Sequence, residues 1–289
     1  MDRSELLKRV RKIEIKTRAL SSNIFAGEYH SAYKGRGMAF SEVREYQPGD
    51  DVRDIDWNVT ARFNRPYVKV YEEERELTVM LLIDMSSSLA FGTSVTYKRD
   101  MVAEIAATLA YSAIQNNDKI GVVLFSDQIE KYIPPKKGRK HIMYIISELL
   151  DFKPQSQRTD IKNAIEFLMQ TQHKSCTAFL ISDFMDRKDY SKALSIMSRK
   201  HDTAAIQVYD HFMEYLPNVG LLKVQDAETG TEQYIDTSSR RIREAHHNAW
   251  QNFKQNLEEI MQRSKTDMIS VRTDENYVKA LINLFAKRP

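Results

Sequence analysis

The sequence predicts a mixed α/β fold, in which helices cover both faces of a mostly parallel sheet and a smaller β-containing segment precedes it. From residue 77 onward, apolar runs of strand length alternate with segments of helix length. These strands are apolar along nearly their whole length, which is typical of strands buried on both faces. We therefore expect a doubly wound sheet over residues 77–289.

The elements of this larger part follow from their patterns in order. The first strand, residues 77–83, is a near-continuous hydrophobic run, and residues 97–115 are predicted as a helix because Met101, Ile105 and Leu109 share one face. An edge strand at 128–133 should stop at Pro134 and Pro135. The other expected strands are 119–125, 176–182, 203–209 and 268–271, with a hairpin at 219–234. The other expected helices are about 139–151, 160–171, 189–200, 240–263 and 277–286.

Residues 1–76 are predicted to form a separate N-terminal domain. A helix is expected at 3–19, where Leu6, Val10 and Ile13 make an apolar stripe between basic side chains. A turn is expected at residues 48–51, a short helix at 57–63 and a strand at 67–71. The predicted boundary with the larger domain lies between residues 76 and 77.

Composition excludes several classes of protein. The chain has 289 residues, 42% hydrophobic and 29% charged, which suits a folded globular protein rather than a disordered one. Its net charge of +3 is too small to indicate nucleic-acid binding, although the basic helix leaves that as a weaker alternative. No apolar run is long enough for a membrane span, and a single cysteine suits a reducing compartment. We expect a soluble cytoplasmic protein.

Oxygen-bearing side chains follow the predicted strands at the sheet edge where ligands of open parallel sheets bind. Asp84, Ser86 and Ser88 follow the first strand, Asp183 follows the strand at 176–182, and Thr159 precedes the helix at 160. Such oxygen donors suit Mg²⁺ or Mn²⁺ rather than zinc. Mg²⁺ keeps several waters, so a water position is expected to exchange for an acidic side chain of a partner protein.

These five residues match the metal-ion-dependent adhesion site of von Willebrand factor A domains, and the element order from 77 to 287 is similar to that fold. A second resemblance lies in residues 35–62, with Gly35-Arg36-Gly37, Tyr46-Gln47-Pro48-Gly49-Asp50-Asp51, Arg53, Asp54, Asp56-Trp57 and Thr60-Ala61-Arg62. It is similar to the signature of the "domain of unknown function 58" family. The resemblance implies a bacterial cytoplasmic adaptor or co-chaperone of a MoxR-type AAA+ ATPase.

Enzymatic alternatives are weaker. A haloacid-dehalogenase-type phosphatase needs a second aspartate two residues after the first, where this chain has Ser86. No phosphate-binding glycine loop or nucleophile elbow occurs. A hydrolase that uses the same Mg²⁺ or Mn²⁺ ion to activate water stays open as the alternative, although no general base is evident. We therefore predict a non-enzymatic binding module.

The acidic cluster of residues 50–56 has two interpretations. It offers carboxylates to a metal, but Arg53, Arg62 and Arg65 lie close in sequence, so internal ion pairing is the favoured interpretation. Trp57, in the same segment, is expected to anchor a small core.

Overall fold

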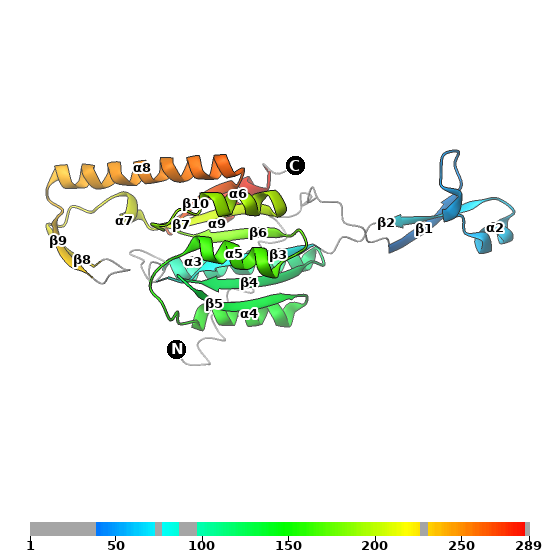
Figure 1. Cartoon of the computed structure of the whole chain (residues 1–289), viewed down its shortest axis with the longest axis horizontal. Helices are drawn as coiled ribbons and strands as arrows, with labels where there is room; N and C mark the ends of the chain where they lie inside the picture. The colour runs from blue at the N-terminus through cyan, green and yellow to red at the C-terminus, as the bar shows by residue number, and fades with distance from the viewer. Residues whose placement is uncertain (1–38, 73–76, 87–96, 226–230, 287–289) are drawn as a thin grey trace. The chain divides into compact units, whose positions relative to one another are not determined.

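The structure is a computed structural model that describes residues 39–72, 77–86, 97–225 and 231–286 (Figure 1). The described residues divide into two compact units, 39–72 and 77–286, and each is described by itself. Residues 1–38, which include the predicted helix at 3–19, lie outside the described residues. The domain boundary proposed from the sequence therefore stays a prediction.

The larger unit is built on a six-stranded sheet (Figure 1). Every neighbouring pair of strands is parallel except the last, in which β5 runs antiparallel to β4. This mixed α/β sheet confirms the predicted fold class. The strands in spatial order are β10 (Asp267–Arg272), β7 (Asp202–Tyr209), β6 (Thr177–Ser182), β3 (Thr78–Asp84), β4 (Lys119–Phe125) and β5 (Ile129–Lys136).

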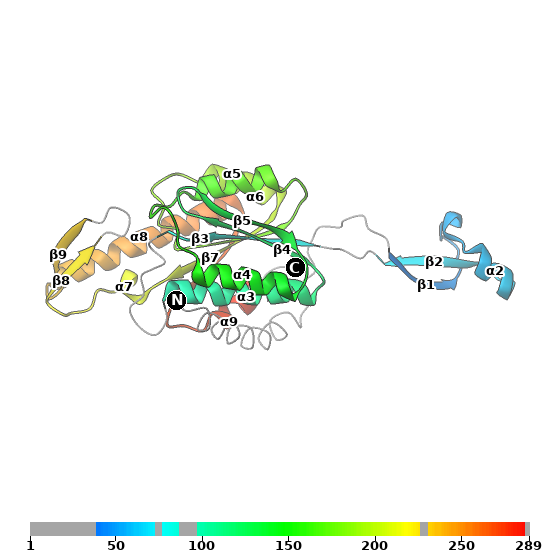
Figure 2. The ribbon, with the colours of Figure 1, turned by 90° about the horizontal axis from the view of Figure 1, so that it is seen from below.

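Two hydrophobic cores lie on opposite faces of this sheet, and strand alternation feeds both. In β3, Val79, Leu81 and Ile83 belong to one core, whereas Met80 and Leu82 belong to the other. Figure 2 shows the two layers of helices on either side of the sheet. The first core is covered by α3 (Lys98–Gln115), α4 (Arg139–Asp151) and α9 (Tyr277–Ala286). The second is covered by α5 (Ile161–Thr171), α6 (Ser191–Lys200) and α8 (Arg240–Ser264).

The edge strand β5 corrects one prediction. The strand does not stop before Pro134 but continues through both prolines to Lys136. A proline has no backbone N–H to donate, and an edge strand tolerates this because one of its sides has no partner strand. The pairing with β4 is irregular there, with a shift in register between Ile120 and Val122.

Three further elements of the larger unit, two strands and a short helix, are not part of the six-stranded sheet. Strands β8 (Leu221–Gln225) and β9 (Glu232–Asp236) form the predicted antiparallel hairpin, whose turn lies outside the described residues. A four-residue helix, α7 (His211–Glu214), was not predicted because one turn shows no periodicity. Within the described part of the chain, no helix is both long and apolar enough to cross a bilayer.

The smaller unit pairs β1 (Ala39–Glu45) with β2 (Tyr67–Glu72), joined through the 3₁₀-helix η1 (Val52–Asp54) and α2 (Trp57–Phe63). Its carboxylates serve local structure. Asp50 forms a two-bonded ion pair with Arg44, at 2.7 and 2.8 Å, while Asp51 and Asp56 cap the two helices. Internal ion pairing is therefore confirmed for Asp50 and for Asp56, which lies 3.6 Å from the Nζ of Lys69, but the partners are Arg44 and Lys69 rather than the expected arginines.

The expectation for Trp57 was wrong. Its side chain is 70% exposed, and Phe63 at the other end of α2 is 63% exposed. Asp56 caps α2 by accepting hydrogen bonds from the backbone N–H groups of Asn58 and Val59. The cap and the short strand pair therefore define this helix, with no apolar core around Trp57.

Candidate metal centre

Asp84 ends the central strand β3 and is completely buried. Both oxygens of its carboxylate have partners. Oδ1 accepts a hydrogen bond from the backbone N–H of Ser86 at 2.9 Å. Oδ2 accepts one from the Ser182 hydroxyl at 2.6 Å. Ser182 is the last residue of the neighbouring strand β6, so the two strand ends are joined by side chains at the same edge of the sheet.

Asp183 follows β6 directly and is 1% exposed. Its Oδ2 accepts from the Nζ of Lys98 at 3.2 Å, and its Oδ1 accepts from the backbone N–H of Met185 at 3.2 Å. The chain turns at Phe184, which has a φ of 62°, in the left-handed region that a bulky residue rarely adopts. This turn brings the Met185 N–H back toward the Asp183 carboxylate.

Two buried carboxylates thus share one small volume at the ends of β3 and β6. Burial, together with the charge of Asp183, raises the pKa of Asp84 to about 7, although the hydrogen bonds from Ser182 and Ser86 act in the opposite direction. Lys98, which is 2% exposed, supplies one positive charge beside Asp183. One ammonium cannot balance two ionised carboxylates, so the remaining negative charge must be balanced by a proton on Asp84 or by a further cation.

Thr159 is placed at the same edge by a backbone contact. It is 7% exposed and directly precedes Asp160, the N-cap of α5. The Asp160 N–H donates to the carbonyl of Ser126 at 3.0 Å, and Ser126 follows the end of β4. The loop with Thr159 is therefore held beside the end of β4, the strand next to β3.

The structure brings Asp84, Ser86 and Asp183 together, with Ser86 3% exposed. Thr159 lies in the adjoining loop, and Ser88 lies outside the described residues. Two residues of this site were not singled out from the sequence, Ser182 and Lys98. Ser182 was detectable as a hydroxyl at a strand end, whereas nothing in the pattern around Lys98 marks it as buried.

The donors present fit a hard divalent cation. They are carboxylate and hydroxyl oxygens, which Mg²⁺ and Mn²⁺ prefer, with no imidazole or thiolate among them. In the described part of the chain, no group of three or more His, Cys, Asp or Glu side chains is placed to hold a metal. A cation here would rely on two carboxylates, hydroxyls and waters.

Comparison with known proteins shows relatives along the whole chain. The "Uncharacterized protein Mb1516" of Mycobacterium bovis is 29% identical over 296 residues, which cover 100% of this chain and 91% of that protein.

Two solved structures show low similarity to this chain. BatB from Bacteroides thetaiotaomicron has 15% identity and a TM-score of 0.47, covering 73% of this chain and 98% of that one. The SpRpn10 VWA domain has 10% identity and a TM-score of 0.40, covering 74% and 96%. The larger unit itself, with its parallel sheet and one antiparallel edge strand, has the von Willebrand factor A-like fold predicted from the sequence.

A family model matches most of the chain. Residues 42–256 match the family described as "Protein of unknown function DUF58". The match spans both the segment of residues 42–62 that resembles the family signature and most of the sheet that holds Asp84 and Asp183. The chain therefore belongs to the DUF58 family.

Proposed function

We propose that this protein is a non-enzymatic, metal-dependent protein-interaction module of the bacterial cytoplasm. A Mg²⁺ or Mn²⁺ ion would be held by Asp84, Ser86, Ser88, Thr159 and Asp183. One coordination position would accept an acidic side chain of the partner. The observation that supports this most strongly is the pair of buried carboxylates, Asp84 and Asp183, at the ends of neighbouring parallel strands.

The electrostatics of the pair support a cation. Asp84 has a pKa raised to about 7, because burial and the nearby charge of Asp183 disfavour its ionised form. A bound divalent ion would lower the pKa of Asp84 again, since a nearby positive charge favours the ionised carboxylate. The chain's own residues would then contribute two carboxylates already positioned by Ser182, Ser86 and Met185.

The proposed partner is a MoxR-type AAA+ ATPase, for which this protein would act as adaptor or co-chaperone. This assignment rests on the family resemblance of the sequence. A partner carboxylate that completes the metal's coordination would give specificity through geometry, because Mg²⁺ demands near-octahedral ligands.

A pull-down of the cognate ATPase tests the proposal. The parent protein, Asp84→Asn and the control Asp151→Asn are compared in Mg²⁺ and in EDTA. Asp151 ends α4 with an exposed side chain. We expect capture only by the parent and the control, and only in Mg²⁺, while thermal melting shows that all three are folded. Capture by Asp84→Asn in EDTA would contradict a metal-bridged contact.

The hydrolase alternative is tested with the same variants. The parent is incubated with generic phosphate and peptide substrates in Mn²⁺. We expect no turnover above that of the buffer. Turnover in the parent and in Asp151→Asn that disappears in Asp84→Asn would instead establish a metal-dependent hydrolase.

A further inference from the structure

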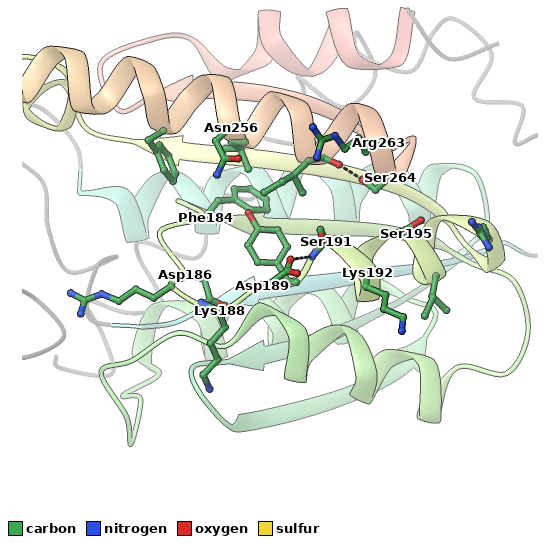
Figure 3. A pocket seen from close by; sticks show the side chains of 17 residues that line it. Phe184, Asp186, Lys188, Asp189, Ser191, Lys192, Ser195, Asn256, Arg263 and Ser264 are labelled. Atoms are coloured by element: carbon green, nitrogen blue, oxygen red, sulfur yellow. Dashed lines mark hydrogen bonds between the residues drawn. The ribbon is translucent and has the colours of Figure 1, made fainter.

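A cavity of about 730 Å³ lies between helices α6 and α8 (Figure 3). Figure 3 shows Asn256, Arg263 and Ser264 of α8 on one side of it, with Lys192 and Ser195 of α6 on the other. This volume is in the range of ligand-binding sites. We call it the α6–α8 groove. Its apolar lining consists of Phe184, Tyr190, Ile196, Phe253, Leu257 and Ile260.

The groove has a buried apolar floor and one exposed apolar side chain, Ile196 of α6. Phe184, Tyr190 and Leu257 are buried, so they form the floor, whereas Ile196 is 48% exposed. An isoleucine exposed above an apolar floor offers area that a partner's side chain can remove from water. The groove begins one residue after Asp183 but includes neither that residue nor Asp84.

The charged side chains of the groove are mostly basic. Five cations face two carboxylates, a formal excess of three positive charges; the set is Arg187, Lys188, Lys192, Arg199, Arg263, Asp186 and Asp189.

Both carboxylates already accept backbone hydrogen bonds. Asp186 accepts from the N–H groups of Ile161 and Lys188, each at 2.8 Å, and Asp189 accepts from that of Ser191 at 2.9 Å.

Two of the five cations are paired with carboxylates outside the lining, Lys188 with Asp160 at 2.5 Å and Arg263 with Glu259 at 3.2 Å. The positive charge offered to a partner therefore rests mainly on Lys192 and Arg199.

Two of these basic side chains lie on one exposed face of α6, with an isoleucine between them. Lys192, Ile196 and Arg199 are exposed and occur at i, i+4 and i+7 on α6, so they share one face of the helix. Among the described residues, Lys192 and Arg199 form no ion pair. Their Cα atoms are about 10 Å apart at the rise of an α-helix.

We propose that the α6–α8 groove binds an acidic amphipathic helix of a partner protein. Glutamates at i and i+7 of that helix match the separation of Lys192 and Arg199. Leucines between them, at i+3 and i+4, cover Ile196 and reach the floor around Leu257. A third helix laid into a groove between two helices is a common mode of peptide recognition.

The basic rim alone would also attract a nucleic acid, but the exposed Ile196 at the mouth of the groove favours a peptide. Of the three aromatic side chains in the lining, Phe184 and Tyr190 are buried, so only Phe253 is accessible for stacking with an unpaired base, and a phosphate backbone gains nothing from covering Ile196. This inference goes beyond the proposed function, because the groove requires no metal.

Fluorescence anisotropy with the full chain in EDTA tests the inference. The probe is a fluorescein-labelled helical peptide with Glu at i and i+7 and Leu at i+3 and i+4. We expect saturable binding that weakens at least about tenfold in Lys192→Glu/Arg199→Glu, since two attractions become repulsions. Ile196→Ala should also weaken binding, and a peptide with Gln in place of Glu should bind far less.

The matched control is Lys140→Glu/Lys279→Glu. It changes the formal charge by the same amount, but its exposed lysines are on α4 and α9, which cover the other face of the sheet. We expect the control to bind the peptide as the parent does.

Three results would overturn the inference. They are no binding of the acidic peptide, equal weakening in the control variant, and tighter binding of a single-stranded oligonucleotide than of the peptide. None of them bears on the metal-bridged contact, because binding is measured in EDTA. Conversely, if the ATPase pull-down fails but the acidic peptide binds, the groove is a binding site independent of the proposed metal-bridged contact.

Discussion

Lys98 is the residue on which the charge balance of the candidate metal centre depends. Its side chain is 2% exposed, and its ammonium lies 3.2 Å from a carboxylate oxygen of Asp183. A buried lysine is costly unless it is paired, so this ion pair fixes the start of α3 against the end of β6. The ammonium also occupies one side of the carboxylate that a divalent cation would use.

We expect Lys98→Met to destabilise the protein and to make it more dependent on metal. Removing one partner of a buried ion pair typically costs about 3 to 5 kcal/mol, because the other charge stays buried without compensation. A divalent cation should restore part of this loss. In thermal melts with and without Mg²⁺, the rise in Tm caused by Mg²⁺ should be larger in Lys98→Met than in the parent.

The control for this prediction is Lys140→Met, which removes an exposed lysine on α4. It should leave both Tm values near those of the parent. If Mg²⁺ raised the Tm of Lys98→Met no more than that of the parent, the ammonium and the metal would not act on the same carboxylates.

The residues of the candidate metal centre differ in how far the sequence predicts them. Asp84 and Asp183 were predicted because each follows an apolar strand, and strand ends meet at one edge of a parallel sheet. Lys98 was missed because a lysine at the first turn of a helix is usually solvated, and only the packing of α3 on the sheet buries it. Burial of a charge depends on contacts far apart in sequence.

The absence of a side chain at Gly121 allows β4 to pair closely with β5, a strand that contains two prolines. A Cβ atom at Gly121 would lie 2.7 Å from the Met80 sulfur and 3.0 Å from both the Ile133 carbonyl oxygen and the Pro135 nitrogen. The two backbones therefore approach each other closely, where the register of the β4–β5 pair shifts.

We predict that Gly121→Ala destabilises the protein by about 1 to 3 kcal/mol, the usual cost of overpacking a core. Met80 can move, but the backbone atoms of β5 cannot move without breaking ladder hydrogen bonds. Urea denaturation followed by circular dichroism measures the change. An unchanged free energy of unfolding would mean that β5 is held less tightly against β4 than the structure shows.

His201 joins α6 to β7 and is fully buried. Its Nδ1 accepts a hydrogen bond from the backbone N–H of Cys176 at 3.2 Å, so the ring is neutral in the folded state. Burial, with a smaller effect of the Lys200 charge, lowers the pKa of His201 from 6.5 to about 4.

The protein should therefore lose stability as pH falls from about 6.5 toward 4. In this window the unfolded chain binds a proton at His201 and the folded chain does not, so the unfolded state is favoured. Above pH 6.5 the contribution is fully present. We expect this part of the pH dependence to be absent in His201→Gln when its free energy of unfolding is compared with that of the parent at pH 7 and pH 4.5. Parallel curves for the two proteins would contradict it.

The elements of the sheet were predictable because their signals are strong. The strands β3, β4 and β6 are buried on both faces, so they appear in the sequence as continuous apolar runs. The predicted end of β5 was wrong because proline was expected to end the strand. A strand at the edge of the sheet tolerates proline, since one of its sides has no partner strand. Whether a strand lies at the edge depends on the arrangement of the whole sheet, so the sequence of that strand alone does not predict it.

At the scale of the whole molecule, the two units have very different cores. The larger unit has two apolar cores packed on a six-stranded sheet. In the smaller unit, neither η1 nor α2 contains a buried residue, and Trp57 and Phe63 are more than half exposed. A two-stranded pair with so little buried apolar area has low stability by itself.

We predict that residues 39–72 exchange their backbone amide hydrogens much faster than β3, β4, β6 and β7. Exchange in stable core strands requires global unfolding, whereas a unit with few buried contacts opens locally at a much lower free energy. Hydrogen–deuterium exchange of the full chain, followed by mass spectrometry of its peptides, measures both regions in one sample. Equal protection of the two regions would contradict the prediction, and it would imply that Trp57 and Phe63 are covered in solution.

Repeating the exchange with the proposed ATPase partner present then tests whether the smaller unit or the metal centre makes the contact. Protection gained only with the ATPase would make the smaller unit part of that interface, and protection confined to peptides near Asp84 and Asp183 would leave the contact at the metal centre.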